Sequence, residues 1–359
     1  MLCSRNARRR SRSEDHAALK VSNHLGNVVV FGASGHTGRF VVAELERRAI
    51  NAVLVGRNVE KLSRLAAGHG GFEVRAASID DASSLDRALA GASFVIHCAG
   101  PFVDTAEPVI NAALRAHAHY MDVSAEQRVT LATFERFAEA RTAGVVLIPS
   151  MGFFGGLGDL LATAAMKDWT SADEIRVVVA MDSWRPTRGT RLTGEMNPGP
   201  RSVYSNNILI PLKDPPSLQW YFPLPFGMQD VVAFPLTETI VISRHLRSPE
   251  VHAFLNRTAL DDIHNPNTPA PTCVDESGSS DQRFLMEAVV RKGNKERRTS
   301  VAGQDIYAIT APLVVKAAQQ ILNADVRTTG VRAAGEIFNA EQFLRALAAE
   351  TPSFHFDYS

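Results

Sequence analysis

Apolar and polar residues alternate along residues 28–150 in short blocks that switch between strand spacing and helix spacing. Residues 28–31 form a β-branched run bounded by glycine, which is typical of a buried parallel strand. Residues 37–48 then carry apolar positions at helical spacing. Further short apolar runs, separated by helical patterns or turns, lie at 52–55, 72–76, 93–97, 120–123 and 145–148. Repeated strand–helix units of this length predict an α/β fold with a Rossmann-type, doubly wound parallel sheet.

The pattern changes after Pro149. A glycine-rich stretch at 150–159 precedes one further helix, and from about Glu174 onward strand-like runs dominate. These runs lie at 175–181, 202–210, 239–244 and 284–291. Because their connections are short or proline-rich, they predict a second α+β domain built on a mostly antiparallel sheet. The organisation expected from these patterns is a Rossmann domain over 28–150, a substrate domain over 151–305 and C-terminal helices over 306–359.

The composition is that of an ordinary globular protein. The chain has 359 residues, of which 45% are hydrophobic and 21% are charged, so it is long enough for two domains. Lys and Arg together number 38, as do Asp and Glu, and this balance argues against nucleic acid and anionic membranes as partners. No apolar stretch reaches the roughly 18 residues that a membrane span needs. We expect a small molecule as the substrate. Exposed strand edges in the second domain could pair between two copies of the chain, which makes a homodimer an open alternative to a monomer.

Residues 1–27 are rich in arginine and lack an apolar segment, which is unlike a secretory signal. We expect a disordered basic tail there. The cysteines, Cys3, Cys98 and Cys273, are scattered along the chain and form no Cys-x-x-Cys pair. This spacing favours a reducing compartment, and we therefore expect a cytoplasmic protein.

Three glycines follow the first strand in the order Gly-x-x-Gly-x-x-Gly, and their expected roles concern the backbone. Gly32 suits a tight turn, Gly35 lets a phosphate approach the main chain, and Gly38 lets the helix pack close to the strand. The N-terminus of the helix then offers free N–H groups and a positive dipole end to a pyrophosphate. With a strand before it and a helix after it, this loop predicts a dinucleotide site.

The end of the second strand distinguishes NAD from NADP. An NAD site places a carboxylate there, which accepts a hydrogen bond from the ribose 2′-hydroxyl. This chain instead has Arg57 and Asn58, and the next acidic residue is Glu60. A planar guanidinium suits a 2′-phosphate, because it donates paired, charge-assisted hydrogen bonds. The sequence therefore predicts NADP as the cofactor.

Candidate groups for proton transfer gather at the end of the run at 120–123. Tyr120, Asp122 and Ser124 lie at this strand end, and such groups can donate a proton or orient a substrate. A structural role is the alternative, with Asp122 or Ser124 capping the following helix. No metal site is expected, since the nearby pair His117 and His119 has no third ligand in view.

Residues 98–102 follow the run at 93–97, beside the switch point where ligands bind in open α/β sheets. Gly100 and Pro101 are expected to form a rigid turn against the nicotinamide ribose or the pyrophosphate. Cys98 is interpreted as a small buried residue rather than a nucleophile, because no partner base is evident nearby in the sequence.

The second domain carries two further candidate features. Arg185, Arg188, Arg191 and Arg201 cluster around a flexible glycine and offer a grip for a substrate carboxylate, although a solvated loop explains them equally well. A group of aromatic residues either lines an apolar pocket or packs in the core. These residues are Trp184, Trp220, Tyr221, Phe222 and Phe226.

Taken in order, these stretches resemble the saccharopine dehydrogenase-like oxidoreductases. The matching pieces are 32–39, 55–58, 99–102, 119–126, 149–159 and 303–313, and the resemblance runs from about residue 27 to about residue 347. It implies an NADP-binding Rossmann domain, a second α+β domain behind it and a C-terminal helix that returns to the first domain. One departure is Ser78, where relatives commonly carry an aspartate near the adenine.

The resemblance also implies which residues hold the cofactor. Those expected around the adenine-side ribose and the phosphates are Gly32, Ser34, Gly35, Thr37, Gly38, Arg39, Arg57 and Asn58. Those expected beside the nicotinamide are Ala99, Gly100, Pro101 and Phe102. The family resemblance does not decide the substrate, because related members act on different bonds.

The leading hypothesis is an NADPH-dependent oxidoreductase. It would transfer hydride to an imine or an activated double bond of a small metabolite, either carboxylate-bearing or apolar, with Asp122, Ser124 and Tyr120 as expected proton relays. The alternative is a non-catalytic NADP(H)-binding sensor or accessory protein. The lack of an unmistakable acid–base pair in the sequence favours that alternative.

Overall fold

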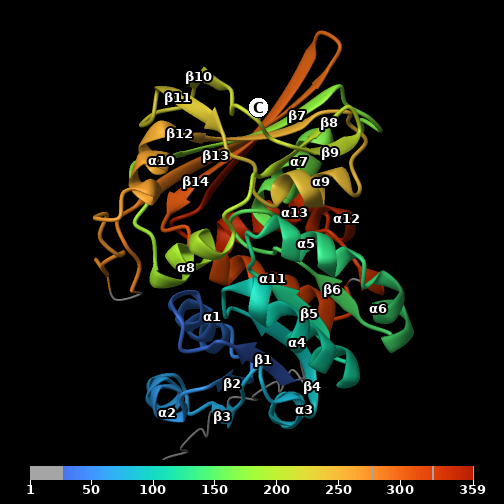
Figure 1. The fold of residues 1–359 in the computed structure, drawn as a ribbon, viewed down its shortest axis with the longest axis vertical. Helices are drawn as coiled ribbons and strands as arrows, with labels where there is room; N and C mark the ends of the chain where they lie inside the picture. The colour runs from blue at the N-terminus through green and yellow to red at the C-terminus, as the bar shows by residue number, and fades with distance from the viewer. Residues whose placement is uncertain (1–26, 276–277, 326, 359) are drawn as a thin grey trace, which may run out of the picture.

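The computed structural model describes residues 27–275, 278–325 and 327–358, and the tail expected at 1–27 lies outside them apart from Asn27. Two sheets form the frame of the molecule (Figure 1). A seven-stranded sheet lies in the lower part of this view, a nine-stranded sheet lies in the upper part, and helices lie between them. This arrangement confirms the predicted α/β class, with a Rossmann-type sheet and a second, mixed sheet.

The first sheet is parallel throughout its paired strands. Its strands, in spatial order, are β15 (Gly330–Val331), β6 (Val146–Ile148), β5 (His119–Asp122), β4 (Ala92–His97), β1 (Asn27–Phe31), β2 (Ala52–Gly56) and β3 (Glu73–Ala76). The helices that connect them are α1 (His36–Arg47), α2 (Val59–Gly68), α3 (Ala82–Leu89), α4 (Phe102–Arg115), α5 (Gln127–Phe134) and α6 (Phe137–Ala143). The strand order reverses between β1 and β4, which makes that position the switch point of the sheet.

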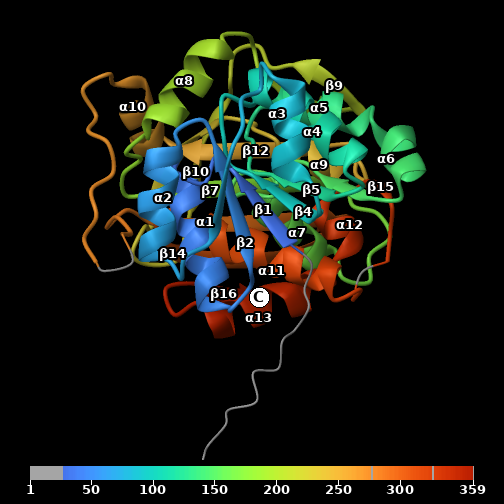
Figure 2. The same ribbon diagram turned by 90° about the horizontal axis from the view of Figure 1, so that it is seen from below.

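Both faces of the first sheet are buried, which explains the continuous apolar runs of its strands. Successive side chains of β1 point to opposite faces. Val28 and Val30 join the core cluster that contains α1 and α11 (Thr310–Leu322), whereas Val29 and Phe31 join the cluster that contains α3 and α4. Figure 2 shows these two helix layers on either side of the strands.

The second sheet is mostly antiparallel, as predicted, with one parallel pair between β12 and β7. Its main path runs through β10 (Ser217–Tyr221), β11 (Met228–Ala233), β12 (Val251–Asn256), β7 (Glu174–Met181), β13 (Arg283–Lys292), β14 (Lys295–Gln304) and β16 (His355–Tyr358). The hairpin of β8 (Ser202–Ser205) and β9 (Ile208–Pro211) pairs with β12. The helices of this part are α7 (Gly156–Met166), α8 (Arg188–Met196), α9 (Glu238–Ser243), α10 (Arg257–His264), α12 (Ala334–Ile337) and α13 (Ala340–Glu350).

The segment after residue 305 contributes to both sheets. Helix α11 packs against α1 and β4, and β15 extends the first sheet beside β6. Helix α13 packs against α7, and β16 pairs with β14 at the edge of the second sheet. The return of the chain to the first sheet therefore involves α11 and β15, while its last strand belongs to the second sheet.

Two expected elements of the second domain differ in the structure. The sequence predicts a strand over residues 239–244, whose first four residues are β-branched, but residues 239–243 form most of α9, in which Glu238 to Ile242 are all buried. Packing against α7 and β12 overrides the strand preference of these side chains. The strand expected at 202–210 is the β8–β9 hairpin, because Asn206 and Asn207 both adopt positive φ and form a tight turn.

Candidate cofactor and substrate cavity

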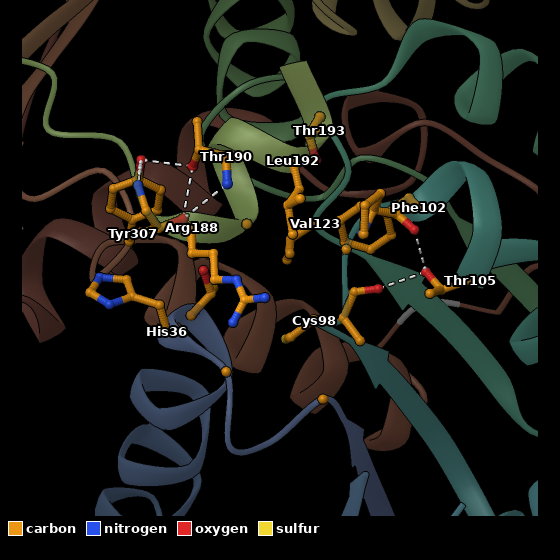
Figure 3. Close-up of a pocket in the computed structure, with 18 of the residues that line it drawn as sticks. His36, Cys98, Phe102, Thr105, Val123, Arg188, Thr190, Leu192, Thr193 and Tyr307 are labelled. Carbon is orange, nitrogen blue, oxygen red and sulfur yellow. Dashed lines mark hydrogen bonds between the residues drawn. The ribbon is translucent and has the colours of Figure 1, made fainter. Parts of the chain in front are cut away.

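The main cavity opens at the switch point of the first sheet, between the carboxyl ends of β1, β2 and β4 and the helix α8 (Figure 3). Its volume is about 770 Å³. The β1–α1 glycine loop and the start of α2 form one part of its wall. Phe153, Phe154, Trp184 and residues of α8 form another part. The cavity therefore joins the predicted dinucleotide loop to an aromatic region supplied by the second domain.

The glycine loop has the geometry that its spacing predicts. Gly32 adopts a φ of 83°, and a Cβ atom there would lie 2.7 Å from the Cβ of Ala99. A Cβ at Gly38 would collide with the carbonyl oxygen of Gly32, so α1 can approach β1 only because Gly38 has no side chain. The Gly35 N–H closes the turn by donating to the Gly32 carbonyl at 2.9 Å. A dinucleotide phosphate fits this bare backbone loop at the start of a helix.

Arg57, Asn58 and Lys61 form the end of the cavity next to β2. The Asn58 side chain caps α2 by accepting a hydrogen bond from the Lys61 N–H at 2.9 Å. Arg57 is exposed, and Arg57 and Lys61 bring positive charge to this end of the cavity, where the 2′-phosphate of NADP is expected. Sequence reasoning named Arg57 and Asn58 but missed Lys61, one helical turn further along.

Most of the predicted cofactor residues line this cavity. They are Gly32, Ser34, Gly35, Thr37, Arg57, Asn58, Ala99, Gly100, Pro101 and Phe102. Gly38 is buried beneath the loop, where its role is packing. Arg39 is exposed on α1 and is not part of the cavity wall, so the structure does not bring it to the expected cofactor contacts.

Glu126 holds the turn that leads from β4 into α4. Its carboxylate accepts hydrogen bonds from the N–H groups of Phe102, at 2.8 Å, and Val103, at 3.0 Å. It also accepts from the Thr193 hydroxyl of α8, at 3.3 Å. A carboxylate at a helix N-terminus pairs with unsatisfied N–H groups and the positive end of the helix dipole. One buried residue thus links the expected nicotinamide end of the cavity to α8.

Tyr120, Asp122 and Ser124 lie behind the cavity wall, and the exposed fraction of each residue is 0%. Asp122 accepts hydrogen bonds from the N–H groups of Ser124, at 3.0 Å, and Ser150, at 2.9 Å, and from the Tyr120 hydroxyl. The Ser124 hydroxyl in turn accepts from the Glu126 N–H. Their burial argues against the expectation that these side chains transfer protons directly to a substrate. The three side chains instead position the β5–α5 loop.

The four arginines of the second domain differ in whether they contact other parts of the protein or line the cavity. Arg185 pairs with Asp281 at 2.9 Å, and Arg191 donates to the carbonyl oxygens of Asn265 and Thr268. Arg201 lies over the ring of Phe234. Arg188 alone among the four extends into the cavity (Figure 3). The cluster is therefore no common grip for a carboxylate.

Tyr307, which lies just before α11, and His36, the first residue of α1, line the cavity side by side and lie edge to face, with ring centres 5.1 Å apart. The Tyr307 hydroxyl accepts a hydrogen bond from the Trp184 indole N–H at 3.1 Å and bonds with the Thr190 hydroxyl at 2.9 Å. Burial raises the pKa of Tyr307 and lowers that of His36. Both side chains are therefore uncharged at neutral pH.

Comparisons with known proteins agree with this geometry. Residues 28–148 match the saccharopine dehydrogenase NADP binding domain. This part of the chain is therefore similar to the NADP-binding domain of the saccharopine dehydrogenases. The cofactor of this domain is NADP. Within the described residues, no helix is long and apolar enough to cross a membrane.

The similar curated proteins share mainly this domain. A human saccharopine dehydrogenase-like oxidoreductase is 33% identical over 146 residues, covering 35% of this chain and 34% of the relative. A lipid droplet localized protein of Caenorhabditis elegans is 29% identical over 140 residues, covering 35% and 33%. The matched region thus spans about a third of the length of these relatives.

A solved structure extends the similarity of fold to nearly the whole chain. Saccharopine dehydrogenase (L-Glu forming) from Saccharomyces cerevisiae, in its apo form, matches with a TM-score of 0.64. The match covers 93% of this chain and 100% of the yeast chain, at 12% sequence identity. At this identity the likeness concerns the fold, including the second sheet, and leaves the substrate undetermined.

Sequence reasoning only partly identified the residues that face this NADP-binding domain across the cavity. Trp184 lines the cavity, whereas Trp220 and Phe222 pack in a separate core cluster and Tyr221 is exposed. Tyr307 was missed, although it lies in the stretch at 303–313 that carries the family resemblance. Neither the spacing nor the composition of that stretch indicates which side chain reaches the cavity.

Proposed function

We propose that the protein is an NADPH-dependent reductase of the saccharopine dehydrogenase-like type. One observation carries this proposal: the cavity continues from the NADP loop past the end of β4 into a region walled by Phe153, Phe154, Trp184 and Leu192. This region offers space for a second molecule beside the expected nicotinamide end. Its aromatic wall favours a substrate with an apolar body, reduced at an imine or an activated double bond.

When bound, NADPH supplies the hydride for such a reduction. Arg57 and Lys61 would hold its 2′-phosphate, and the glycine loop would hold its pyrophosphate. The contribution of Glu126 is positional, because it fixes the start of α4 beside the expected nicotinamide. Phe153, Phe154 and Trp184 would form the apolar wall of the substrate region.

Proton delivery in this proposal falls to the Tyr307 and His36 pair. These are titratable groups that lie beside the aromatic wall and face the cavity. Tyr307 keeps its proton because burial raises its pKa, and its hydroxyl is held in place by Trp184 and Thr190. The pair replaces Tyr120, Asp122 and Ser124, whose side chains are enclosed by protein.

A transfer experiment tests the proposed reaction. The protein is incubated with NADPH deuterated on either face of C4 and with a panel of cyclic imines and α,β-unsaturated compounds that carry apolar bodies. Deuterium that enters a product from one labelled face only supports a positioned hydride transfer. Products that carry no deuterium from either labelled NADPH contradict it.

A non-catalytic NADP(H) sensor is the second candidate, and the burial of Tyr120, Asp122 and Ser124 favours it. A sensor needs the cofactor end of the cavity but no substrate region. Tight NADPH binding without oxidation of NADPH by any member of the panel supports this candidate. A homodimer through the edge strands of the second sheet and a cytoplasmic location stay predictions.

A further inference from the structure

Arg188 is the first residue of α8, and its side chain extends into the cavity toward the β1–α1 loop, between His36 and Cys98 (Figure 3). Across the described residues 27–275, 278–325 and 327–358, its guanidinium has no ion-pair partner. A guanidinium presents paired hydrogen-bond donors that suit an oxyanion. The side chain is therefore placed to bind an anion inside the cavity rather than to hold the protein together.

The distribution of charge around the cavity indicates which anion this is. Arg57 and Lys61 lie together at the β2 end, where the 2′-phosphate is expected, and the glycine loop contributes backbone N–H groups but no cation. Both phosphate groups of the cofactor pyrophosphate carry a negative charge. Arg188 enters the cavity across from the glycine loop and brings positive charge to that part of the cavity.

Helix α8 is attached to the rest of the protein mainly through polar contacts. No residue of α8 is buried, so little apolar packing holds the helix in place. Polar contacts tether it instead: Thr190 with the Tyr307 hydroxyl, Thr193 with Glu126, and Arg191 with the carbonyl oxygens of the 265–268 loop. An ionic contact between Arg188 and a bound anion would add to these tethers at the first residue of the helix.

We propose that Arg188 forms the cationic wall of the pyrophosphate site and that α8 closes over the bound cofactor through this contact. The guanidinium donates to the pyrophosphate from the side opposite the glycine loop. Bound NADP then holds α8 as the roof of the substrate region that lies beneath Leu192 and Thr193. This inference rests on the NADP site and extends it to the second domain.

Binding measurements with two probes separate Arg188 from the other cations. NADPH contains both the 2′-phosphate and the pyrophosphate, whereas adenosine 2′-monophosphate contains only the former. Arg188→Ala should weaken NADPH binding by roughly tenfold or more and leave the binding of adenosine 2′-monophosphate unchanged. Arg188→Lys should lose less, because the charge remains. Arg57→Ala should weaken the binding of both probes.

Arg185→Ala is the matched control, because it removes the same charge from the same segment. Its side chain pairs with the exposed Asp281 and does not line the cavity. The Arg185→Ala variant should bind both probes like the wild type. Hydrogen exchange supplies a second readout: NADP⁺ should slow exchange of the α8 amides in the wild type and in Arg185→Ala, and much less in Arg188→Ala.

The inference is overturned if Arg188→Ala binds NADPH with the wild-type dissociation constant. The same holds if NADP⁺ slows exchange of the α8 amides in Arg188→Ala as much as in the wild type, because the guanidinium would then not hold α8 on the cofactor. Weakening of both probes by Arg188→Ala would also overturn it, since the contact would not be specific to the pyrophosphate. A wild-type protein that binds NADPH without reducing any substrate contradicts the proposed reaction and leaves this cofactor contact standing.

Discussion

The Tyr120 hydroxyl donates a hydrogen bond to the Asp122 carboxylate, with 3.0 Å between Tyr120 Oη and Asp122 Oδ2. The same hydroxyl lies 3.0 Å from Nδ1 of His97, so it joins two buried titratable groups. Burial raises the pKa of Asp122 to about 6 and lowers the pKa of His97 to about 3. These opposite shifts make the network a source of pH-dependent stability rather than an open proton relay.

The Asp122→Asn substitution should change how stability depends on pH. The contribution of Asp122 is fully present below its usual pKa of 3.8 and is lost as the pH rises through about 6. The contribution of His97 is present above its usual pKa of 6.5 and is lost as the pH falls toward about 3. The two slopes oppose each other between about pH 4 and pH 6, and the variant keeps only that of His97.

The free energy of unfolding of Asp122→Asn should therefore rise with pH over that window, by up to about 1.4 kcal/mol per pH unit relative to the wild type. Urea unfolding at several pH values measures this difference. Asp86→Asn, which changes a more exposed carboxylate paired with Arg115, is the control and should give the wild-type slope. Parallel profiles for the wild type and Asp122→Asn would contradict this account of the network.

Cys98 should be unreactive although it lines the cavity. Burial raises the pKa of its thiol to about 12, with the Asp122 charge adding to the effect. Since the thiolate is the reacting species, iodoacetamide at neutral pH should modify the exposed Cys273 well before Cys98. Peptide mapping by mass spectrometry gives the two rates. Modification of Cys98 as fast as that of Cys273 would contradict this prediction, because it would require an environment that stabilises the Cys98 thiolate.

The Tyr307→Phe substitution should affect stability and turnover together. It removes the hydroxyl that accepts from Trp184 and bonds with Thr190, and a buried indole N–H without a partner costs about 1–3 kcal/mol. The free energy of unfolding should fall by about that amount, as measured by urea denaturation. If Tyr307 also delivers the proton, kcat falls while the dissociation constant of NADPH stays near that of the wild type.

Tyr204→Phe provides the comparison for this variant, because Tyr204 lies on β8 outside the main cavity. The Tyr204→Phe substitution should leave the free energy of unfolding and kcat unchanged. A Tyr307→Phe enzyme with reduced stability but unchanged kcat would assign the hydroxyl to the attachment of α8 alone. That outcome would remove Tyr307 from the proposed proton delivery.

The sequence predicts the cofactor half of the site far better than the substrate half. Gly32 and Gly38 lie where the surrounding backbone leaves no space for a side chain. A glycine pattern between a strand and a helix therefore predicts the geometry of this loop. The substrate half depends on contacts between residues distant in the chain, such as Thr193 with Glu126. No local pattern encodes that pairing.

The dependence on contacts between distant residues also explains why the sequence does not predict the role of the strand-end polar groups or the helical conformation of α9. Asp122 and Ser124 follow a strand at the expected edge of the sheet, but whether such groups face a cavity depends on what covers them. Here the loop at Ser150 covers Asp122 and accounts for its burial. The β-branched residues of α9 likewise take their conformation from their neighbours and not from their own preference.

The proposed function depends on the binding of NADP through Arg57 at the β2 end of the cavity. Paired fluorescence titrations with NADPH and NADH, on the wild type and on Arg57→Ala, measure this binding. Arg64→Ala is the matched control, since Arg64 is a nearby arginine on α2 that does not line the cavity. We expect the wild type and Arg64→Ala to bind NADPH at least roughly tenfold more tightly than NADH, and Arg57→Ala to lose that preference. Equal binding of the two nucleotides by the wild type would show that the cavity does not select the 2′-phosphate and would exclude this role of Arg57.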